Sequence, residues 1–287
     1  MTDKFILSLS EKLSEEIVSV KPMSGGSISS AYLIETKSDG YFIKINSGPD
    51  ALRMFHAEQK GLKAIYETGT IAVPRVHFVD YLEDNAVILM DFVESKLPAP
   101  EDYRHLGKSL ASLHKVTQKD FGFSSDNFIG SLFQSNKVHS DWNEFFWSER
   151  LSPQFELAIE KGLLCRKEVP LMNESVSVFN KYSKDVIPSL LHGDLWGGNY
   201  LISVDGTPYL IDPAVYYGHS MVDIAMSKLF GSFGSEFYDA YHRIMPKSEN
   251  YDEEIDFYQL YFLLVHLNMF GSGYYSAVSK ILKRYFK

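Results

Sequence analysis

The stretch HGDLWGGN, residues 192–199, follows two leucines and combines ionisable, amide and glycine residues where an apolar run ends. Asp194 and Asn199 lie five residues apart, and Asp212 closes the next pair of apolar runs. Carboxylate and amide oxygens suit Mg²⁺, which fills the rest of its shell with water and phosphate oxygens. An aspartate that does not bind the metal can accept a proton from a hydroxyl group. The residue types therefore predict a site where a magnesium ion and a proton acceptor lie side by side.

Strand signals after this stretch indicate how its oxygens are held. YLISV and PYLID flank the turn VDGT, which predicts a small hairpin that ends at Asp212. The neighbouring Gly197 and Gly198 give the backbone the freedom to turn sharply. We expect this turn to bring Asn199 back beside Asp194.

Two charged residues in the first third of the chain lie on elements that are otherwise largely apolar. YFIKIN alternates with a period of two, which places Lys44 inside a strand. From Ala51 to Tyr66 the spacing is helical, and Glu58 lies on the apolar stripe of this helix. Because a buried carboxylate needs a cationic partner, we expect Glu58 to pair with Lys44. Two alternatives stay open here: an exposed strand lysine, and a helix turned so that Glu58 lies at the margin of the stripe.

The first 93 residues predict a strand-rich lobe. An opening helix has apolar spacing at Ile6, Leu9, Leu13 and Ile17, and short strand-like runs follow up to NAVILMDFV. The loop SGGS after the first strand can aim N–H groups at a phosphate, although a glycine pair in a hairpin is by itself an ordinary turn. ESKLPAP then predicts a proline-containing linker over residues 94–100.

Residues 101–287 predict a second, mainly helical lobe. EDYRHLGKSLASLHKV and WNEFFWSERLSPQFELAIEKGLL both follow helical periodicity, as does the region 172–187. His114 is expected to be a packing histidine with a hydrogen bond. The aromatic residues expected in the core are Trp142, Phe145, Phe146 and Trp147. The two parts together predict an α+β fold with a β-rich N-terminal lobe and a helical C-terminal lobe that carries the small hairpin.

Composition excludes several classes of protein. With 287 residues, 45% of them hydrophobic, the chain can bury one large core or two lobes. A net charge of −9 gives no basic footprint for nucleic acid. The single cysteine, Cys165, fits a reducing compartment, and no apolar run approaches the roughly 20 residues of a membrane span. We therefore expect a cytoplasmic protein with neither nucleic acid nor a membrane as partner.

Several of these motifs occur in the order found in kinases. HGDLWGGN has the His-x-Asp-x-x-x-x-Asn spacing of the protein-kinase catalytic loop, and IDPA stands where kinases have Asp-Phe-Gly. Six stretches in order make the chain resemble the fructosamine (ketosamine) kinase family: GGSIS, YFIKIN, HGDLWGGN, IDPAVYYGH, DIAMSKLFGSF and HLNMFGSGY. The resemblance implies a two-lobed protein-kinase-like fold and the use of ATP with Mg²⁺.

The resemblance also implies roles for the chemistry-bearing residues at the matching positions. Lys44 contacts the α- and β-phosphates of ATP, and Glu58 orients it. Asp194 is the catalytic base, while Asn199 and Asp212 are the metal ligands. Phosphoryl transfer needs positioning and charge neutralisation more than covalent chemistry, which suits this set.

Further residues take supporting roles by the same resemblance. His192 and Asp223 support the catalytic loop. The residues expected to bind the nucleotide besides Lys44 are Gly25, Gly26 and Ser27 over the phosphates and the backbone of Asp91 and Val93 at adenine.

The acceptor implied by the resemblance is a ketosamine, either small or formed on a protein lysine. The residues expected on the acceptor side are Trp196, His266, Asn268, Phe270 and Tyr274. A core role for Trp196 and a structural role for His266 stay open. The chain departs from the family pattern at Gly197, Ser220 and Met221. These departures leave the sugar open between fructose and a shorter ketose such as ribulose. Two further hypotheses stay open beside the ketosamine kinase: a kinase for another acceptor such as an aminoglycoside or choline, and a nucleotide-binding pseudoenzyme.

Overall fold

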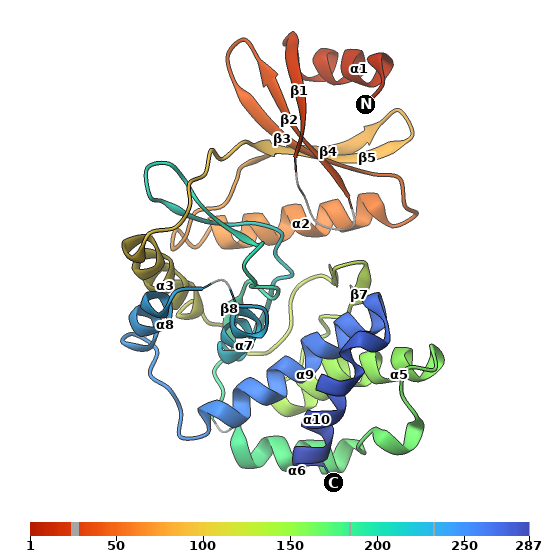
Figure 1. Cartoon of the computed structure of the whole chain (residues 1–287), viewed down its shortest axis with the longest axis vertical. Coiled ribbons are helices and arrows are strands. Elements are labelled where there is room, and N and C mark those ends of the chain that lie inside the picture. Colours follow the sequence, from red (N-terminus) through yellow and green to blue (C-terminus); the bar gives the residue numbers. More distant parts are fainter. Residues whose placement is uncertain (24–28, 184, 232, 287) are drawn as a thin grey trace.

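An antiparallel sheet with a helix on each face makes up the N-terminal third of the chain (Figure 1). The structure, a computed structural model, describes residues 1–23, 29–183, 185–231 and 233–286. The elements of this third are α1 (Asp3–Leu13), β1 (Ile17–Met23), β2 (Ser30–Thr36), β3 (Gly40–Asn46), α2 (Ala51–Tyr66), β4 (Val76–Leu82) and β5 (Asn85–Asp91). The strands lie in the order β1-β2-β3-β5-β4.

The two faces of the sheet have separate apolar contacts, and this separation places Lys44. On one face Phe5 and Leu9 of α1 pack with Ile43 of the central strand β3. On the other face Phe55 of α2 packs against β5. Because side chains alternate along a strand, Lys44 points to the side of α2. The predicted strand and its two faces are therefore confirmed.

The opening helix is shorter than its apolar spacing predicts. It ends at Leu13, and Ile17 begins β1 instead of forming another turn. Ser14 causes the stop, because its φ of 57° is left-handed and its N–H donates to the Glu11 carbonyl. A left-handed residue ends a helix and satisfies its last carbonyls.

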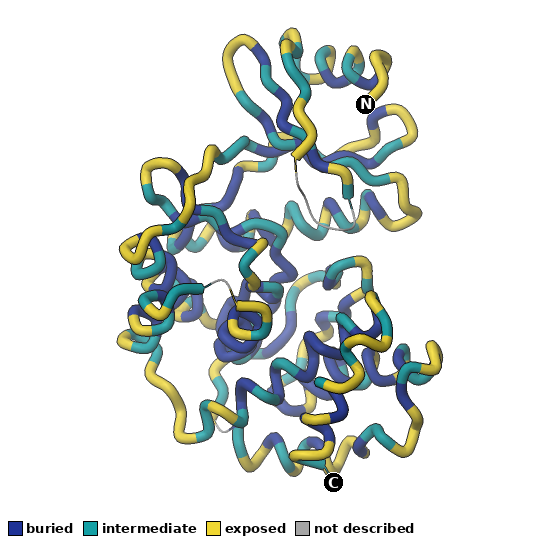
Figure 2. Tube along the Cα trace, viewed as in Figure 1, coloured by how far each residue is buried: buried dark blue, intermediate teal, exposed yellow. Residues whose placement is uncertain are grey.

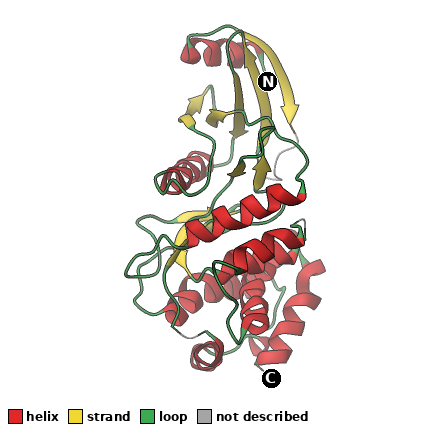
Figure 3. Ribbon diagram, turned by 90° about the vertical axis from the view of Figure 1, so that its left-hand side faces the viewer, coloured by secondary structure: helices red, strands yellow, loops and turns green. Residues whose placement is uncertain are grey.

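The remaining two thirds are mainly helical, as expected (Figure 3). The helices are α3 (Pro100–His114), α4 (Trp142–Phe145), a π-helix (Phe146–Leu151), α5 (Ser152–Glu160), a 3₁₀ turn (Arg166–Glu168), α6 (Met172–Tyr182), α7 (Met221–Leu229), α8 (Ser235–His242), α9 (Tyr251–Phe270), a 3₁₀ turn (Ser272–Tyr274) and α10 (Tyr275–Tyr285). The short strands are β6 (Asn127–Ile129), β7 (Leu132–Gln134), β8 (Ser189–Leu191), β9 (Tyr200–Ile202), β10 (Pro208–Leu210) and β11 (Tyr216–Gly218).

One long helix organises the packing of this region. Helix α9 contacts α5, α7 and α10, and most of it is buried (Figure 2). Trp142 and Phe145 are buried in the same core, as predicted. Two features differ from the sequence expectation: the hairpin β6–β7 interrupts the helices, and a π-helix replaces the continuous helix expected across 142–160. In the described parts of the chain we find no helix with the length and apolarity needed to cross a membrane.

Candidate active site

Three charged residues from distant parts of the chain meet between the sheet and the helical region. The Nζ of Lys44 donates to Glu58 Oε1 at 2.8 Å, and it also donates to Asp212 Oδ1. The Lys44 and Glu58 side chains are only 12% and 13% exposed. The predicted Lys44–Glu58 pair is therefore present, and both alternatives for these residues are excluded. Asp212 adds a second carboxylate that sequence spacing alone could not place.

The charge state of this cluster follows from its burial and its composition. Burial lowers the pKa of Lys44, but the neighbouring carboxylates of Asp212 and Glu58 outweigh it and hold that pKa above its usual range. Burial raises the pKa of Glu58 to about 7, against the attraction of Lys44. Burial also acts on Asp212, yet Lys44 holds its pKa below the usual range. Lys44 therefore remains a cation, which is the charge that a polyphosphate needs.

The loop after β8 is held by one buried carboxylate. Asp223 of α7 accepts hydrogen bonds from the backbone N–H of His192 at 2.7 Å and of Gly193 at 2.9 Å. His114, at the end of α3, binds the same carboxylate through Nε2 and the Tyr241 hydroxyl through Nδ1. The predicted packing role of His114 and the predicted support from Asp223 match this geometry. The brace fixes the backbone immediately before Asp194.

His192 links the loop to the segment that carries Asp212. Its Nδ1 accepts from the Asp194 N–H at 3.2 Å, so its Nε2 carries the proton and donates to the Ile211 carbonyl at 2.8 Å. Burial lowers the pKa of His192, which keeps the ring neutral in this arrangement. The histidine thus holds the loop beside the residue that precedes Asp212.

Glycine is required where the loop passes closest to that segment. Gly193 has a φ of 85°, and a Cβ at this position would lie 2.1 Å from the Ala214 carbonyl oxygen. Ala214 in turn donates its N–H to the His192 carbonyl at 2.8 Å. No side chain fits in this contact, so the loop and the IDPA segment are packed backbone to backbone.

Asp194 and Asn199 meet as the turn of the loop predicts. Asn199 Nδ2 donates to the Asp194 carbonyl at 2.8 Å and to Asp194 Oδ2 at 3.2 Å. Burial raises the pKa of Asp194 to about 7, and the nearby Asp212 carboxylate adds to this rise. Because Asn199 uses its amide nitrogen on Asp194, its amide oxygen is left for another partner. That oxygen and the Asp212 carboxylate are donors of the type that Mg²⁺ prefers, so the residues present fit the ion.

The brace under the loop makes a stability prediction. Asp223→Ala would leave two backbone N–H groups and His114 without their common buried acceptor. We expect the free energy of unfolding to fall by about 3–5 kcal/mol, measured by denaturant titration. Glu156→Ala, which removes an exposed ion pair with Arg166, is the matched control and should change it by at most about 1 kcal/mol. Equal effects of the two substitutions would contradict the brace.

On the other side of the loop, Trp196 is exposed. Its exposed fraction is 39%, which excludes the core role that stayed open for it. The ring lies over Gly198, where a Cβ would come within 2.4 Å of it. The glycine therefore lets the indole fold back along the turn while part of the side chain stays open to solvent.

The end of α9 presents an aromatic group that includes three of the residues expected at the acceptor. The His266 ring lies 4.6 Å from the ring of Phe230, 5.4 Å from that of Phe270 and 5.2 Å from that of Tyr274. Phe230 and Phe270 are exposed by 39% and 53%. Sequence reasoning missed Phe230, although it lies in the family-like stretch DIAMSKLFGSF.

Asn268 corrects the acceptor set. It is 4% exposed, and its Nδ2 donates to the carbonyl and the side-chain oxygen of Gln154, both at 2.9 Å. These hydrogen bonds join α9 to α5. Asn268 thus lies on a different side of α9 from the aromatic group. Ser220 and Met221 are also buried, at 7% and 5%, so these departures from the family pattern act through packing.

Of the residues expected to bind the nucleotide, the structure describes Asp91 and Val93 at the end of the sheet. Gly25, Gly26 and Ser27 lie outside the described residues. Asp91 ends β5, donates its N–H to the Arg75 carbonyl and directs its carboxylate to His77 Nε2 at 2.7 Å. Phe92 follows the strand and donates its N–H to the Gly40 carbonyl, and Val93 comes next in the chain.

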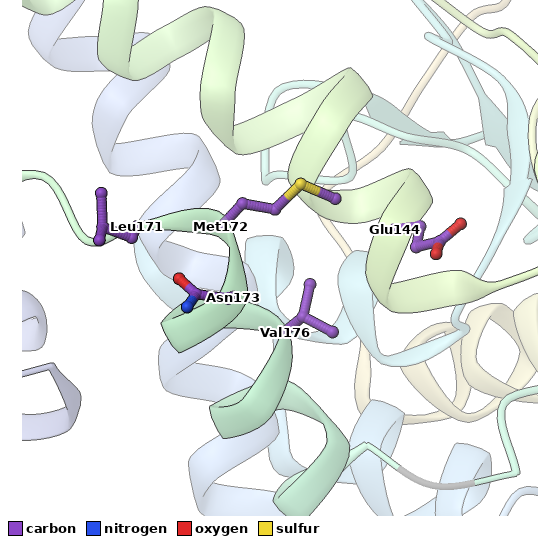
Figure 4. A pocket seen from close by; sticks show the side chains of 5 residues that line it. All are labelled: Glu144, Leu171, Met172, Asn173 and Val176. Atoms are coloured by element: carbon purple, nitrogen blue, oxygen red, sulfur yellow. The ribbon is translucent and has the colours of Figure 1, made fainter.

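A surface hollow elsewhere on the helical region lies apart from this site. It is lined by Glu144 of α4 and by Leu171, Met172, Asn173 and Val176 at α6 (Figure 4). Because none of the residues predicted for chemistry borders it, this hollow is not the candidate active site.

Known proteins similar to this chain share its length and fold. A probable ketoamine kinase of Enterococcus faecium is 39% identical over 269 residues, covering 93% of this chain and 95% of that protein. The chloroplastic protein-ribulosamine 3-kinase of Arabidopsis thaliana is 38% identical over 287 residues, covering 97% and 86%. The crystal structure of a fructosamine-3-kinase candidate from Thermobifida fusca is 29% identical, covers 97% and 96%, and has a TM-score of 0.86.

A more distant likeness concerns the fold alone. An aminoglycoside phosphotransferase in ternary complex with ADP and hygromycin B is 15% identical, covers 98% of this chain and 99% of that one, and has a TM-score of 0.64. This confirms the predicted kinase-like architecture. The family model described as fructosamine kinase matches residues 1–287, and the chain belongs to that family.

Proposed function

We propose that this protein is an ATP-dependent kinase that phosphorylates a sugar hydroxyl of ketosamines. The observation that carries the proposal is the convergence of Lys44, Glu58 and Asp212 beside the Asp194–Asn199 turn. No member of the expected phosphoryl-transfer set is missing, which disfavours a pseudoenzyme. The aminoglycoside alternative has only a likeness of fold behind it. The names of the relatives support a ketosamine as the acceptor.

The proposed roles follow from charge and position. Lys44, held by Glu58, binds the α- and β-phosphates of ATP. Asp194 accepts the proton of the acceptor hydroxyl as its oxygen bonds to the γ-phosphorus and ADP leaves. Asn199 and Asp212 would hold Mg²⁺, which would neutralise phosphate charge when bound. A base with a pKa near the working pH suits the proton transfer assigned to Asp194.

Further parts of the nucleotide site remain proposals. Gly25, Gly26 and Ser27 would cover the phosphates, and the backbone at Asp91 and Val93 would hold adenine.

The proposed division of the chain places the boundary after Val93, with an N-terminal lobe over 1–93, a linker over 94–100 and a C-terminal lobe over 101–287. The cytoplasmic location stays a prediction from the sequence.

The product explains why such a reaction would release amines. Phosphorylation on the hydroxyl beside the carbonyl, on the side away from the amine, places the phosphate β to an enolisable carbon. Loss of a proton from that carbon gives an enaminol that expels the phosphate and leaves an imine. Water then hydrolyses the imine to the free amine and a deoxygenated sugar fragment. The reaction would therefore repair glycated amines, either small or on protein lysines. Fructosyl and ribulosyl acceptors both satisfy this chemistry.

An acceptor panel tests the proposal. The purified protein with ATP and Mg²⁺ is offered fructosyl- and ribulosyl-amines, aminoglycosides and choline, and ADP release is followed. We expect turnover with ketosamines. Turnover with choline or an aminoglycoside and none with any ketosamine would overturn the acceptor class, while no turnover with any of them would favour the pseudoenzyme.

Trp196 makes a specific prediction within this proposal. Trp196→Ala should raise KM for the ketosamine from a few-fold to about a hundredfold, because about 1–3 kcal/mol of apolar and stacking contact is lost. KM for ATP should not change. Tyr66→Ala, which removes an aromatic ring exposed by 70% on α2, is the control and should leave both KM values unchanged. A parental ketosamine KM in Trp196→Ala would remove the residue from the acceptor site.

A further inference from the structure

Helix α2 belongs to the apolar cores of both lobes. Its first half places Ala51 and Phe55 against β5. Its second half places Leu62 and Ile65 in the large core of the helical region. Figure 1 shows the helix lying between the sheet and that region. A helix fixed in this way cannot follow the N-terminal lobe alone.

A glycine occupies the centre of the contact between α2 and the helical region. Gly61 is buried in the interior of a helix of 16 residues, where glycine is less favourable than any residue except proline. A Cβ at this position would lie 3.1 Å from Pro213 Cγ, 3.4 Å from Val215 Cγ2 and 3.5 Å from the Pro213 carbonyl. The missing side chain therefore has a packing reason, which is the close approach of α2 to the IDPAV segment.

This contact lies next to two members of the charged cluster. Glu58 is three residues before Gly61 and so lies on the same face of α2. Asp212 directly precedes Pro213. The segment after the helix is attached to the same region, because Leu210 donates its N–H to the Ala72 carbonyl at 2.9 Å. The separation of Glu58 from Asp212 is thus set by how closely Gly61 lies on Pro213.

We propose that Gly61 is a positioning residue for nucleotide binding. Its lack of a side chain lets α2 lie directly on the Pro213–Val215 segment, and this contact holds Glu58 where it pairs with Lys44 beside Asp212. The three-residue cluster is then assembled before ATP arrives, and no movement of α2 is needed to complete it. The inference rests on the proposed function, since it concerns the lysine that would bind the phosphates.

The substitutions separate this role from simple packing. Alanine is the best helix former, so Gly61→Ala favours the fold of α2 while moving the helix away from Pro213 by a few tenths of an ångström. Gly61→Leu moves it further. Pro213→Ala removes Pro213 Cγ, the atom nearest to the added methyl group. The effect of Gly61→Ala is therefore measured both in the parent and in the Pro213→Ala background. Lys60→Ala, on the exposed side of the same turn, is the matched control.

The experiment measures the Kd of Mg·ATP by calorimetry, both KM values, kcat and the midpoint of thermal unfolding. We expect Gly61→Ala to raise the Kd and KM of ATP about tenfold, since weakening one charge-assisted contact from Lys44 costs on the order of this factor in affinity. Gly61→Leu should exceed this effect and also lower the unfolding midpoint, because it overpacks the contact. In Gly61→Ala the ketosamine KM and the unfolding midpoint should stay at parental values. In the Pro213→Ala background, most of the effect of Gly61→Ala should disappear.

Three results would overturn the inference. The first is a Kd for ATP in Gly61→Ala equal to that of the parent. The second is a rise in this Kd that is as large in the Pro213→Ala background as without it. The third is a Gly61→Ala variant in which kcat and the unfolding midpoint both fall while both KM values stay parental. A parental protein that binds no Mg·ATP would instead overturn the proposed function, and this inference with it.

Discussion

Asp194→Asn should lower kcat by about 10²–10⁴-fold while the affinity for ATP stays nearly unchanged. The amide keeps the size of the side chain but cannot take the proton of the acceptor hydroxyl. Asn199 would still find the Asp194 backbone carbonyl, which is one of its two contacts there. The loop should therefore keep its shape, and the loss should fall on the chemical step. Steady-state kinetics together with calorimetry of Mg·ATP binding measure both parts.

The control for this variant makes the same chemical change elsewhere. Asp239 is exposed on α8, and Asp239→Asn should leave kcat at the parental value. A kcat of Asp194→Asn close to that of the parent would remove Asp194 from the role of base. A loss of ATP binding equal to the loss of kcat would instead place it with the nucleotide ligands.

Asp212→Ala should abolish Mg²⁺-dependent binding of ATP, and turnover should fall by on the order of 10³-fold or more. The substitution removes the only carboxylate of the proposed metal-binding pair, and the Asn199 amide cannot by itself neutralise phosphate charge. It also removes one of the two carboxylates that contact Lys44. Calorimetry with and without Mg²⁺ separates the two losses, because only the metal-dependent part of binding should disappear.

Two outcomes would contradict the assignment of Asp212. Equal binding of Mg·ATP to the variant and the parent would show that the metal is held elsewhere. A loss of ATP binding that is the same with and without Mg²⁺ would assign Asp212 to the orientation of Lys44 alone.

The sequence predicts best where a local pattern forces a contact. The carboxylate of Glu58 on an apolar helical stripe demanded a cation, and the strand before it offered Lys44. The turn expected after Trp196 is present, closed by the Asn199 N–H to the Trp196 carbonyl, and it returns Asn199 to Asp194, although neither Gly197 nor Gly198 has a left-handed backbone there. In both cases the partners are close in the chain, so periodicity and turn chemistry determine the geometry.

Contacts between distant segments could not be derived in this way. Lys44 and Asp212 are 168 positions apart, and they meet through contacts between distant segments, such as those of α2 with the IDPAV segment and of Leu210 with Ala72. The spacing of His266 and Asn268 gave no means to tell which of them faces the aromatic group and which faces α5. Burial decides between them, since Asn268 is 4% exposed and bound to Gln154.

Local sequence patterns also failed to predict where a helix ends when the backbone conformation of a single residue ends it. The apolar spacing of the first helix continues through Ile17, but the left-handed Ser14 ends the helix at Leu13. The π-helix after Phe145 has no periodic signature of its own, because five of its six residues are buried, Glu149 and Arg150 among them. Such features come from tertiary packing, which overrides local spacing.

Mass spectrometry of the reaction mixture tests the central claim most directly. The parental protein, ATP and Mg²⁺ are incubated with a ribulosyl- or fructosyl-amine, and Asp194→Asn serves as the inactive comparison. The proposed function predicts a product heavier by one phosphoryl group, followed by loss of the sugar fragment and appearance of the free amine, in the parental reaction only. An unchanged ketosamine in the presence of bound Mg·ATP would contradict it.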